Sequence, residues 1–403
     1  MAEEYSEFAI TMRGYDRAQV DRKLEQLSRQ LADARREVAS LDQRAMTLAG
    51  ELADAQRRLR ESDKPTYAGL GSRIEQLLRS AEEQSASVLS KANAEADALM
   101  SWGAETGNRV YGHVLVWHSQ TPDWFFQDDS GAFLTSSPEH QAIARERMRT
   151  HINNVAAYLH ERYGDFGSET NPLVAFDVVN EVVSDGAGTA SNGLRTSYWY
   201  QILGEEFIDL AFRYADEAFN STYAAPGTDR PVTLFINEYN TENGTGPGTK
   251  TQRYHALVER LLARGVPVDG VGHQFHASLS TNVDNLAAAM DYFDDLPVVQ
   301  AVTEMDVPTG SPVTEDLLRR QGQFFRSAFD AFRAQQAENN NLFSVTLWGI
   351  ADYRSWRTCS GAPLAFDNDY DGKWAYVGIL GKDVPRESQT LNVFSAPDAS
   401  DPA

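Results

Sequence analysis

Two glutamates that each end an apolar, strand-like stretch are the residues of this sequence best suited to chemistry. Ala175–Glu181 ends in the dipeptide Asn180-Glu181, and Val299–Asp306 carries Glu304 near its end. Glycoside hydrolysis uses such a pair: one carboxylic acid protonates the leaving oxygen, and in the retaining mechanism the other carboxylate, about 5–5.5 Å away, is the nucleophile. The acid must keep its proton near neutral pH, which burial or a neighbouring charge can arrange. Either glutamate alone could instead cap a helix or pair with an arginine.

Aromatic, amide and imidazole side chains follow the other strand-like stretches. Sugars present flat apolar faces and a ring of hydroxyls, so stacking rings and convergent hydrogen-bonding groups suit them. The side chains of this kind are Trp117, His118, Gln274, His276, Trp348 and Trp356. Each tryptophan alone could equally belong to the core. Neither histidine has metal-ligand spacing, and the sequence has no Gly-x-Ser-x-Gly motif and no phosphate-binding glycine loop, so we expect no metal and no cofactor.

These side chains can meet only if the stretches that carry them are neighbouring strands. Strand-like and helical runs alternate beyond residue 100. We expect strands at 112–118, 173–181, 232–237, 270–276, 298–304 and 343–350, and helices at 138–163, 197–223, 249–264, 283–293 and 314–336. The alternation, with strands that are apolar throughout, predicts an α/β fold with a parallel sheet covered by helices. In a (β/α)8 barrel the residues after the strands share one rim, where active sites lie.

The composition limits the partners and the location of the chain. Its 403 residues exceed the usual share of one domain, and its net charge of -22 argues against a nucleic-acid surface. The single cysteine, Cys359, allows no intrachain disulfide. Residues 1–10 have no apolar segment of a signal peptide, and no run is apolar and long enough to span a membrane. We therefore expect the chain, as written, to stay in the cytoplasm.

The first hundred residues follow a different pattern. Apolar residues recur at alternating steps of four and three from Val20 to Leu59, with charged residues between them. This heptad seam predicts a long α-helical coiled coil that self-associates, although one solvated helix is the simpler alternative. A second, looser helical stretch is expected at 70–99. The polar residues 383–403 are expected to form a disordered tail.

The stretch before the seam resembles the start of the DivIVA family, coiled-coil scaffold proteins that gather at curved bacterial membranes. The resemblance rests on Phe8, on Arg13-Gly14-Tyr15-Asp16, and on Val20-Asp21, which the heptads follow directly. It implies self-association and peripheral membrane contact through the loop before Gly14, with Phe8 and Arg13 as candidates. A generic dimerisation stalk is the alternative.

From about residue 98 to 381 the chain resembles glycoside hydrolase family 10, the endo-β-1,4-xylanases. The matching segments are 112–124 (GHVLVWHSQTPDW), 176–181 (FDVVNE), 237–240 (NEYN), 268–276 (VDGVGHQFH), 302–306 (VTEMD), 345–350 (VTLWGI) and 355–357 (SWR). The resemblance implies a TIM barrel, retaining hydrolysis of xylan or xylo-oligosaccharides, and a family that is usually secreted. It implies Glu181 as the acid/base and Glu304 as the nucleophile.

The same resemblance implies roles for residues around the pair. Those implied to contact the sugar are His118, Asn180, Tyr239, Asn240, Gln274, His276, Trp348 and Trp356. Asn180 would bind the 2-hydroxyl of the reacting sugar, and Asp306 would orient His276. Tyr239 and Asn240 would lie on the leaving-group side, and the two tryptophans would form a wall.

The expected strands number six, whereas a closed barrel needs eight. The predicted coiled coil stands where the family has its first two strands and a sugar-gripping Glu-Asn…Lys segment. We therefore expect a DivIVA-like coiled coil at 1–97, an N-terminally truncated xylanase-like barrel at 98–382 and the tail. Lost strand pairing on this scale exceeds the roughly 5–15 kcal/mol stability of a typical domain, so we expect impaired hydrolysis. The alternatives are a scaffold protein at a cell pole or septum, and an artificial or misassembled fusion.

Overall fold

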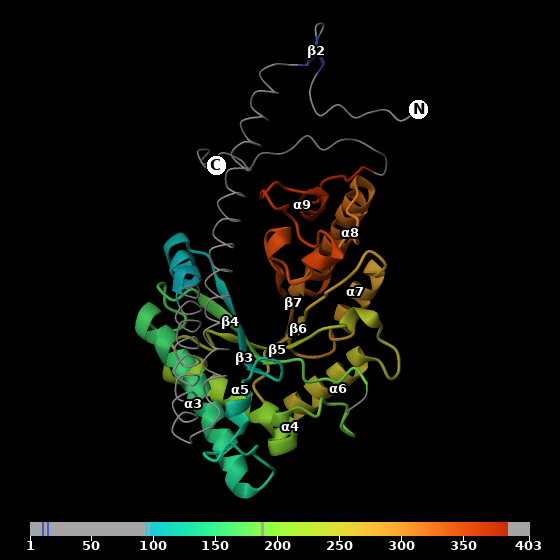
Figure 1. The fold of residues 1–403 in the computed structure, drawn as a ribbon. Coiled ribbons are helices and arrows are strands. Elements are labelled where there is room, and N and C mark those ends of the chain that lie inside the picture. Colours follow the sequence, from blue (N-terminus) through green and yellow to red (C-terminus); the bar gives the residue numbers. More distant parts are fainter. Residues whose placement is uncertain (1–9, 12–13, 16–93, 95–96, 187–188, 386–403) are drawn as a thin grey trace, which may run out of the picture. The chain divides into compact units, whose positions relative to one another are not determined.

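The computed structural model describes residues 10–11, 14–15, 94, 97–186 and 189–385 (Figure 1). The chain divides into two compact units, residues 1–93 and 94–403. In the first unit, β1 (Ile10–Thr11) and β2 (Gly14–Tyr15) pair in antiparallel register. The predicted heptad seam, the membrane-contact candidates Phe8 and Arg13, and almost all of the predicted tail lie outside the described residues.

The second unit is built on one parallel sheet whose strands follow the order of the sequence. The strands are β3 (Val110–Trp117), β4 (Leu173–Asn180), β5 (Thr233–Glu238), β6 (Gly270–His273), β7 (Val299–Met305) and β8 (Leu342–Leu347). Within the described part of the chain, β3 and β8 pair on one side only, so the six strands form an open barrel. The prediction of six parallel strands is confirmed.

Helices follow the strands and cover the outside of the sheet (Figure 1). They are α3 (Pro138–Tyr163), α4 (Tyr198–Leu203), α5 (Glu206–Glu217), α6 (Lys250–Ala263), α7 (Val283–Asp291), α8 (Glu315–Asn339) and α9 (Trp374–Ile379). The bounds predicted for α3 agree with the structure because its ends carry strong local signals. The Ser137 side chain caps the first turn, Pro138 begins the helix, and Gly164 ends it with φ 85°.

The single helix predicted at 197–223 is wrong. Gly204 ends α4 in a left-handed conformation, with φ 66°, and its N–H donates to the carbonyl of Tyr200. The chain then restarts as α5 and closes with a π-helical turn, Ala218–Thr222. A glycine in a left-handed conformation is a common helix terminator, so the break follows from one residue that the periodicity alone did not reveal.

Aromatic side chains fill the inside of the open barrel. Phe235 on β5 is buried, and its ring lies 5.1 Å from Tyr111 on β3 and 5.3 Å from Phe343 on β8. Tyr111 and Phe343 also meet edge to face, at 6.1 Å. Burial of such rings stabilises a fold by about 1.5–3 kcal/mol each. These contacts link the two edge strands across the interior and hold the sheet in its curved form.

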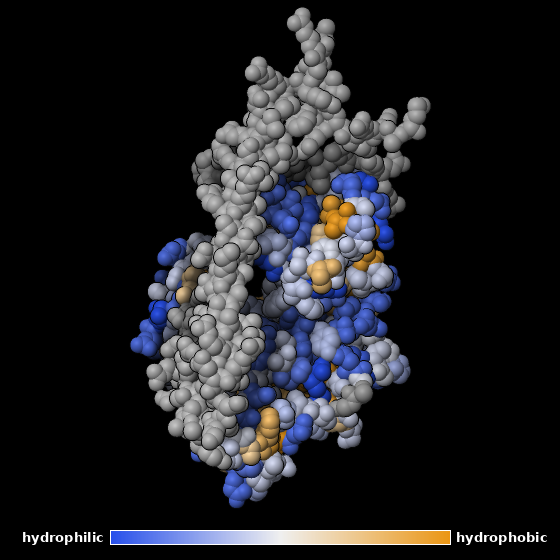
Figure 2. Space-filling model, viewed as in Figure 1, coloured by the Kyte–Doolittle hydropathy of each residue, from blue (hydrophilic) through white to orange (hydrophobic). Residues whose placement is uncertain are grey.

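The surface agrees with the acidic composition. In the view of Figure 2 the described surface is mostly hydrophilic, with scattered apolar patches. Among the residues that the structure describes, no helix combines the length and the apolar composition needed to cross a bilayer.

Candidate active site

Glu181 and Glu304 lie at the same edge of the sheet, where the parallel strands end. Glu181 directly follows β4, and its backbone N–H donates to the carbonyl of Asn237 at the end of β5 (2.9 Å). Glu304 lies near the end of β7, and its N–H donates to the carbonyl of Gln274, just beyond β6 (3.2 Å). Neighbouring strand ends thus place both glutamates on the rim where a parallel barrel presents its active site.

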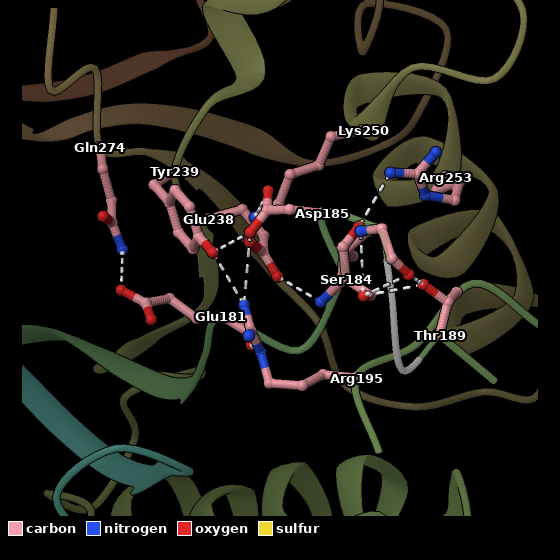
Figure 3. Close-up of polar contacts among 12 residues, drawn as sticks. Glu181, Ser184, Asp185, Thr189, Arg195, Glu238, Tyr239, Lys250, Arg253 and Gln274 are labelled. Carbon is pink, nitrogen blue, oxygen red and sulfur yellow. Dashed lines mark hydrogen bonds and ion pairs between the residues drawn. The ribbon is translucent and has the colours of Figure 1, made fainter. Parts of the chain in front are cut away.

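The carboxyl group of Glu181 is half-buried and held on both oxygens. The indole Nε1–H of Trp117 donates to Oε2 at 3.0 Å. The side-chain amide of Gln274 donates to Oε1 at 3.2 Å (Figure 3). The same amide also donates to Oδ1 of Asn180 at 3.2 Å. Gln274 therefore ties Asn180 to Glu181, and the three side chains form one face of the site.

Glu304 is almost fully buried, with 5% of its surface exposed. The side-chain amide of Asn237 donates to Oε1 at 2.8 Å, and the Thr303 hydroxyl donates to the other end of that amide at 2.7 Å. This second bond orients the amide so that its nitrogen faces the carboxyl group. On the other side, Nε2 of His276 lies 3.2 Å from Oε2. Glu304 thus has a hydrogen-bond donor at each of its two carboxyl oxygens.

His276 stands between two carboxylates. Its Nδ1 lies 3.1 Å from Asp306 Oδ2, at ion-pair distance but outside good hydrogen-bond geometry. Asp306 is buried and accepts hydrogen bonds from Trp356 Nε1 (2.9 Å) and Arg357 Nη1 (2.6 Å). Burial alone would lower the pKa of His276, but Asp306 and Glu304 together raise it to about 9. The imidazole is therefore charged near neutral pH and links the two acids.

The His276 ion pair predicts a pH-dependent part of the stability. The folded pKa, about 9, exceeds the unfolded value of 6.5, so the stabilisation is fully present below pH 6.5 and is lost as the pH rises through 9. His276→Gln should lower the free energy of unfolding by roughly 3 kcal/mol more at pH 6 than at pH 10. Urea unfolding of both proteins at several pH values measures this. If the difference in unfolding free energy between wild type and His276→Gln did not change with pH, the assignment of a charged imidazole to His276 would be contradicted.

The other predicted residues surround the pair unevenly. His118 is half-buried, and burial together with the nearby Arg195 cation lowers its pKa to about 4, so its imidazole is neutral. The ring of Trp356, which is 63% exposed, meets His276 edge to face at 5.0 Å. Trp348 packs 5.3 Å from His113. Within the described residues, neither Trp348 nor Asn240 hydrogen-bonds to either glutamate.

Three residues in contact with the site are absent from the predicted set. Asn237 contacts Glu304, Arg357 contacts Asp306, and Arg195 donates from Nε to the backbone carbonyl of Glu181 at 3.0 Å. The sequence could have indicated Asn237 as a site residue, because it is an amide at the end of a predicted strand, as Asn180 is. Arg195 follows a long loop, and no pattern in the sequence indicates where its side chain folds back.

The family of the chain follows from comparison with known proteins. The model of glycosyl hydrolase family 10 matches residues 79–382. The chain belongs to this family. The family 10 match confirms the expected TIM-barrel type of fold, of which the structure describes six strands. A second model, that of DivIVA protein, matches residues 4–119, so the two matches overlap and the family 10 match begins before the predicted residue 98.

Several family 10 relatives are similar over most of this chain. Endo-1,4-beta-xylanase A of Thermoanaerobacterium saccharolyticum is 35% identical over 285 residues, which are 71% of this chain and 22% of the relative. Exoglucanase XynX of Acetivibrio thermocellus is 36% identical over 284 residues, 70% of this chain and 24% of the relative. The chain thus spans about a quarter of the length of these curated relatives.

Solved structures agree with the family. TsXylA, an intracellular xylanase from Thermoanaerobacterium saccharolyticum solved in complex with xylotetraose, superposes with a TM-score of 0.60 at 37% identity, covering 70% of this chain and 79% of that one. Xylanase B from Clostridium stercorarium F9 gives a TM-score of 0.60 at 31% identity, covering 71% and 82%.

Proposed function

We propose that this chain hydrolyses β-1,4-xylosidic bonds within xylan or xylo-oligosaccharides and retains the configuration at the anomeric carbon. The observation that carries the proposal is the pair of strand-end carboxyl groups, each held by its own set of hydrogen-bond donors on one rim. The xylanases among the relatives and the xylotetraose bound to TsXylA support xylan as the substrate class.

The proposed reaction assigns a different role to each glutamate. The Glu304 carboxylate, oriented by Asn237 and His276, attacks the anomeric carbon while the Glu181 carboxyl gives its proton to the leaving sugar oxygen. The glycosidic C–O bond breaks and an ester bond to Glu304 forms. Glu181, now ionised, takes a proton from water, whose oxygen attacks the anomeric carbon and releases Glu304.

Neighbouring side chains would hold the sugar and the two acids. Asn180, which Gln274 orients, would bind the 2-hydroxyl of the reacting sugar. Asp306 would act through His276 as a positioning residue. The remaining proposed contacts to sugar come from His118, Tyr239, Asn240, Gln274, His276, Trp348 and Trp356.

Release of reducing ends from xylan by the purified full-length chain tests the proposal. We expect endo-cleavage into short xylo-oligosaccharides. We expect it to be slow, because the sheet of the described residues is open at β3 and β8 and so lacks part of the wall around the site. The absence of any release above the background of a Glu304→Gln protein would contradict the proposal.

The match to the DivIVA protein model favours a second function for the N-terminal region. We propose that residues 1–97 form a self-associating coiled coil and a scaffold with membrane contact at Phe8 and Arg13. Residues 98–382 would form the barrel and residues 383–403 a disordered tail. A cytoplasmic location would suit both regions, and the relation to a xylanase described as intracellular supports it.

The full chain should be a dimer by native mass spectrometry if the heptad seam self-associates. Lysines at two seam positions, Leu24→Lys with Leu31→Lys, should give a monomer, because charged side chains in the seam prevent apolar packing. The matched control, Gln26→Lys with Ala32→Lys, adds the same charge outside the seam and should remain a dimer. A wild-type monomer, or dissociation by both double variants, would contradict association through this seam.

A further inference from the structure

The backbone of Glu181 has an unusual conformation that other residues must maintain. Its φ of 57° lies in the left-handed region, which residues other than glycine rarely adopt because the conformation is strained. Both of its backbone polar groups have partners. The N–H donates to the carbonyl of Asn237, and the carbonyl accepts from Arg195 Nε at 3.0 Å.

Arg195 is itself fixed at several points (Figure 3). Its backbone N–H donates to the carbonyl of Val182 at 2.7 Å, and its Nη2 donates to the Tyr239 hydroxyl at 2.8 Å. The Tyr239 hydroxyl donates to the Asp185 carboxylate, which also lies 3.6 Å from Arg195 Nη2. The guanidinium is therefore held between the end of β4 and the end of β5.

A buried ion pair anchors this network to the sheet. Lys250 Nζ lies 3.1 Å from Asp185, 2.9 Å from Glu238 and 3.3 Å from the centre of the Tyr239 ring. Glu238 is fully buried on β5, and its Oε1 accepts from the N–H of Val183 at 2.6 Å. The contacts thus begin and end on the segment that carries Glu181, and they fix its carbonyl and the amide two residues later.

We propose that Arg195, held by Tyr239 and Asp185, is a positioning residue that directs the carboxyl group of Glu181 at the leaving-group oxygen. This inference rests on the proposed function and extends it. Arg195 acts through the backbone of Glu181, so its loss should weaken only those steps in which Glu181 transfers a proton. A residue that merely stabilised the fold would affect all substrates alike.

Substrates that differ in their need for a proton separate the two roles. A phenyl β-xylobioside needs protonation of its leaving oxygen, whereas a 2,4-dinitrophenyl β-xylobioside releases a stable phenolate without it. For Arg195→Gln in the full chain, we expect kcat/KM to fall about 10–100-fold for the phenyl substrate and by less than about threefold for the dinitrophenyl substrate. The conservative variant Arg195→Lys, which keeps a cation and a donor, should recover part of the loss.

Arg253, on α6, offers a matched control because its side chain reaches the loop that carries Arg195. It donates to the carbonyls of Ser184 (2.8 Å) and Gly248 (2.6 Å) but, within the described residues, contacts neither Glu181 nor Tyr239. Arg253→Gln should therefore change kcat/KM for the two substrates by the same small factor. An Arg195→Gln protein that loses both activities equally, or neither, would overturn the positioning role.

Hydrogen exchange, measured by mass spectrometry, keeps the inference testable without turnover. If the wild-type chain cleaves neither substrate, the proposed function fails, and the positioning claim is judged by the peptide that contains Glu181 to Asp185. Its amides should exchange faster in Arg195→Gln than in wild type. Equal exchange in the two proteins would overturn the claim that Arg195 holds this segment.

Discussion

Glu304→Gln is expected to lower kcat on xylan and on the dinitrophenyl xylobioside by at least about 10⁴-fold, because an amide cannot form the ester intermediate. Activation of the leaving group cannot compensate, since the attacking atom itself is lost. The substitution nearly preserves the shape of the side chain, so the Asn237 contact to Oε1 can persist. The measurement is kcat on both substrates.

The circular dichroism spectrum of the Glu304→Gln protein serves as its control and should match that of the wild type. Residual activity above about one per cent of wild type on the dinitrophenyl substrate would exclude Glu304 as the nucleophile.

Glu181→Gln is expected to separate the two substrates. Loss of the general acid should lower kcat/KM on xylan by about 10²–10⁴-fold, while kcat/KM on the dinitrophenyl xylobioside stays close to wild type. The general base is lost too, so breakdown of the glycosyl-enzyme should become slow and produce a burst of dinitrophenol followed by a slow steady state. Rapid-mixing kinetics measures both phases.

Glu181→Gln and Glu304→Gln serve as controls for each other, because each variant removes one carboxyl group from the same rim. Added azide, a nucleophile that needs no base, should accelerate the slow phase of Glu181→Gln and leave Glu304→Gln inactive. Equal losses on both substrates in Glu181→Gln, with no effect of azide, would contradict its assignment as the acid/base.

Elements with strong local signals could be predicted from the sequence. The strands that carry Glu181 and Glu304 are apolar runs of the expected length, and the structure places their ends within one or two residues of the prediction. The ends of α3 are marked by Ser137, Pro138 and Gly164. Since parallel strands bring their ends to one rim, the neighbourhood of the two glutamates also followed from the pattern.

Contacts that depend on loops could not be predicted. Arg195 reaches the carbonyl of Glu181 only because the chain between them turns back, and Trp356 reaches Asp306 from a separate loop. Neither contact leaves a periodic signal, since each joins residues through the tertiary fold. The break at Gly204 was missed for a related reason: the apolar residues continue on both sides of it, and the direction change comes from backbone conformation alone.

The open sheet should affect the rate at which the chain hydrolyses its proposed substrate. The rings of Tyr111 and Phe343 link the two edge strands across the interior, and each of β4 to β7 is paired on both sides. The proposed acid/base Glu181 directly follows β4 and the proposed nucleophile Glu304 lies near the end of β7, two of these inner strands. Contacts that would hold the sugar beyond β3 and β8 are separate from these two positions. We therefore expect the open sheet to weaken substrate affinity more than it slows the chemical step.

The configuration of the first product tests the central claim most directly. Proton NMR of the wild-type chain acting on xylo-oligosaccharides should show the β-anomer of the new reducing end first, followed by slow conversion to the equilibrium mixture, because two displacements at Glu304 retain the configuration. The signal should be absent with Glu304→Gln. Initial appearance of the α-anomer, or an unchanged signal from the Glu304→Gln protein, would contradict the assignment of Glu181 and Glu304 as a retaining pair.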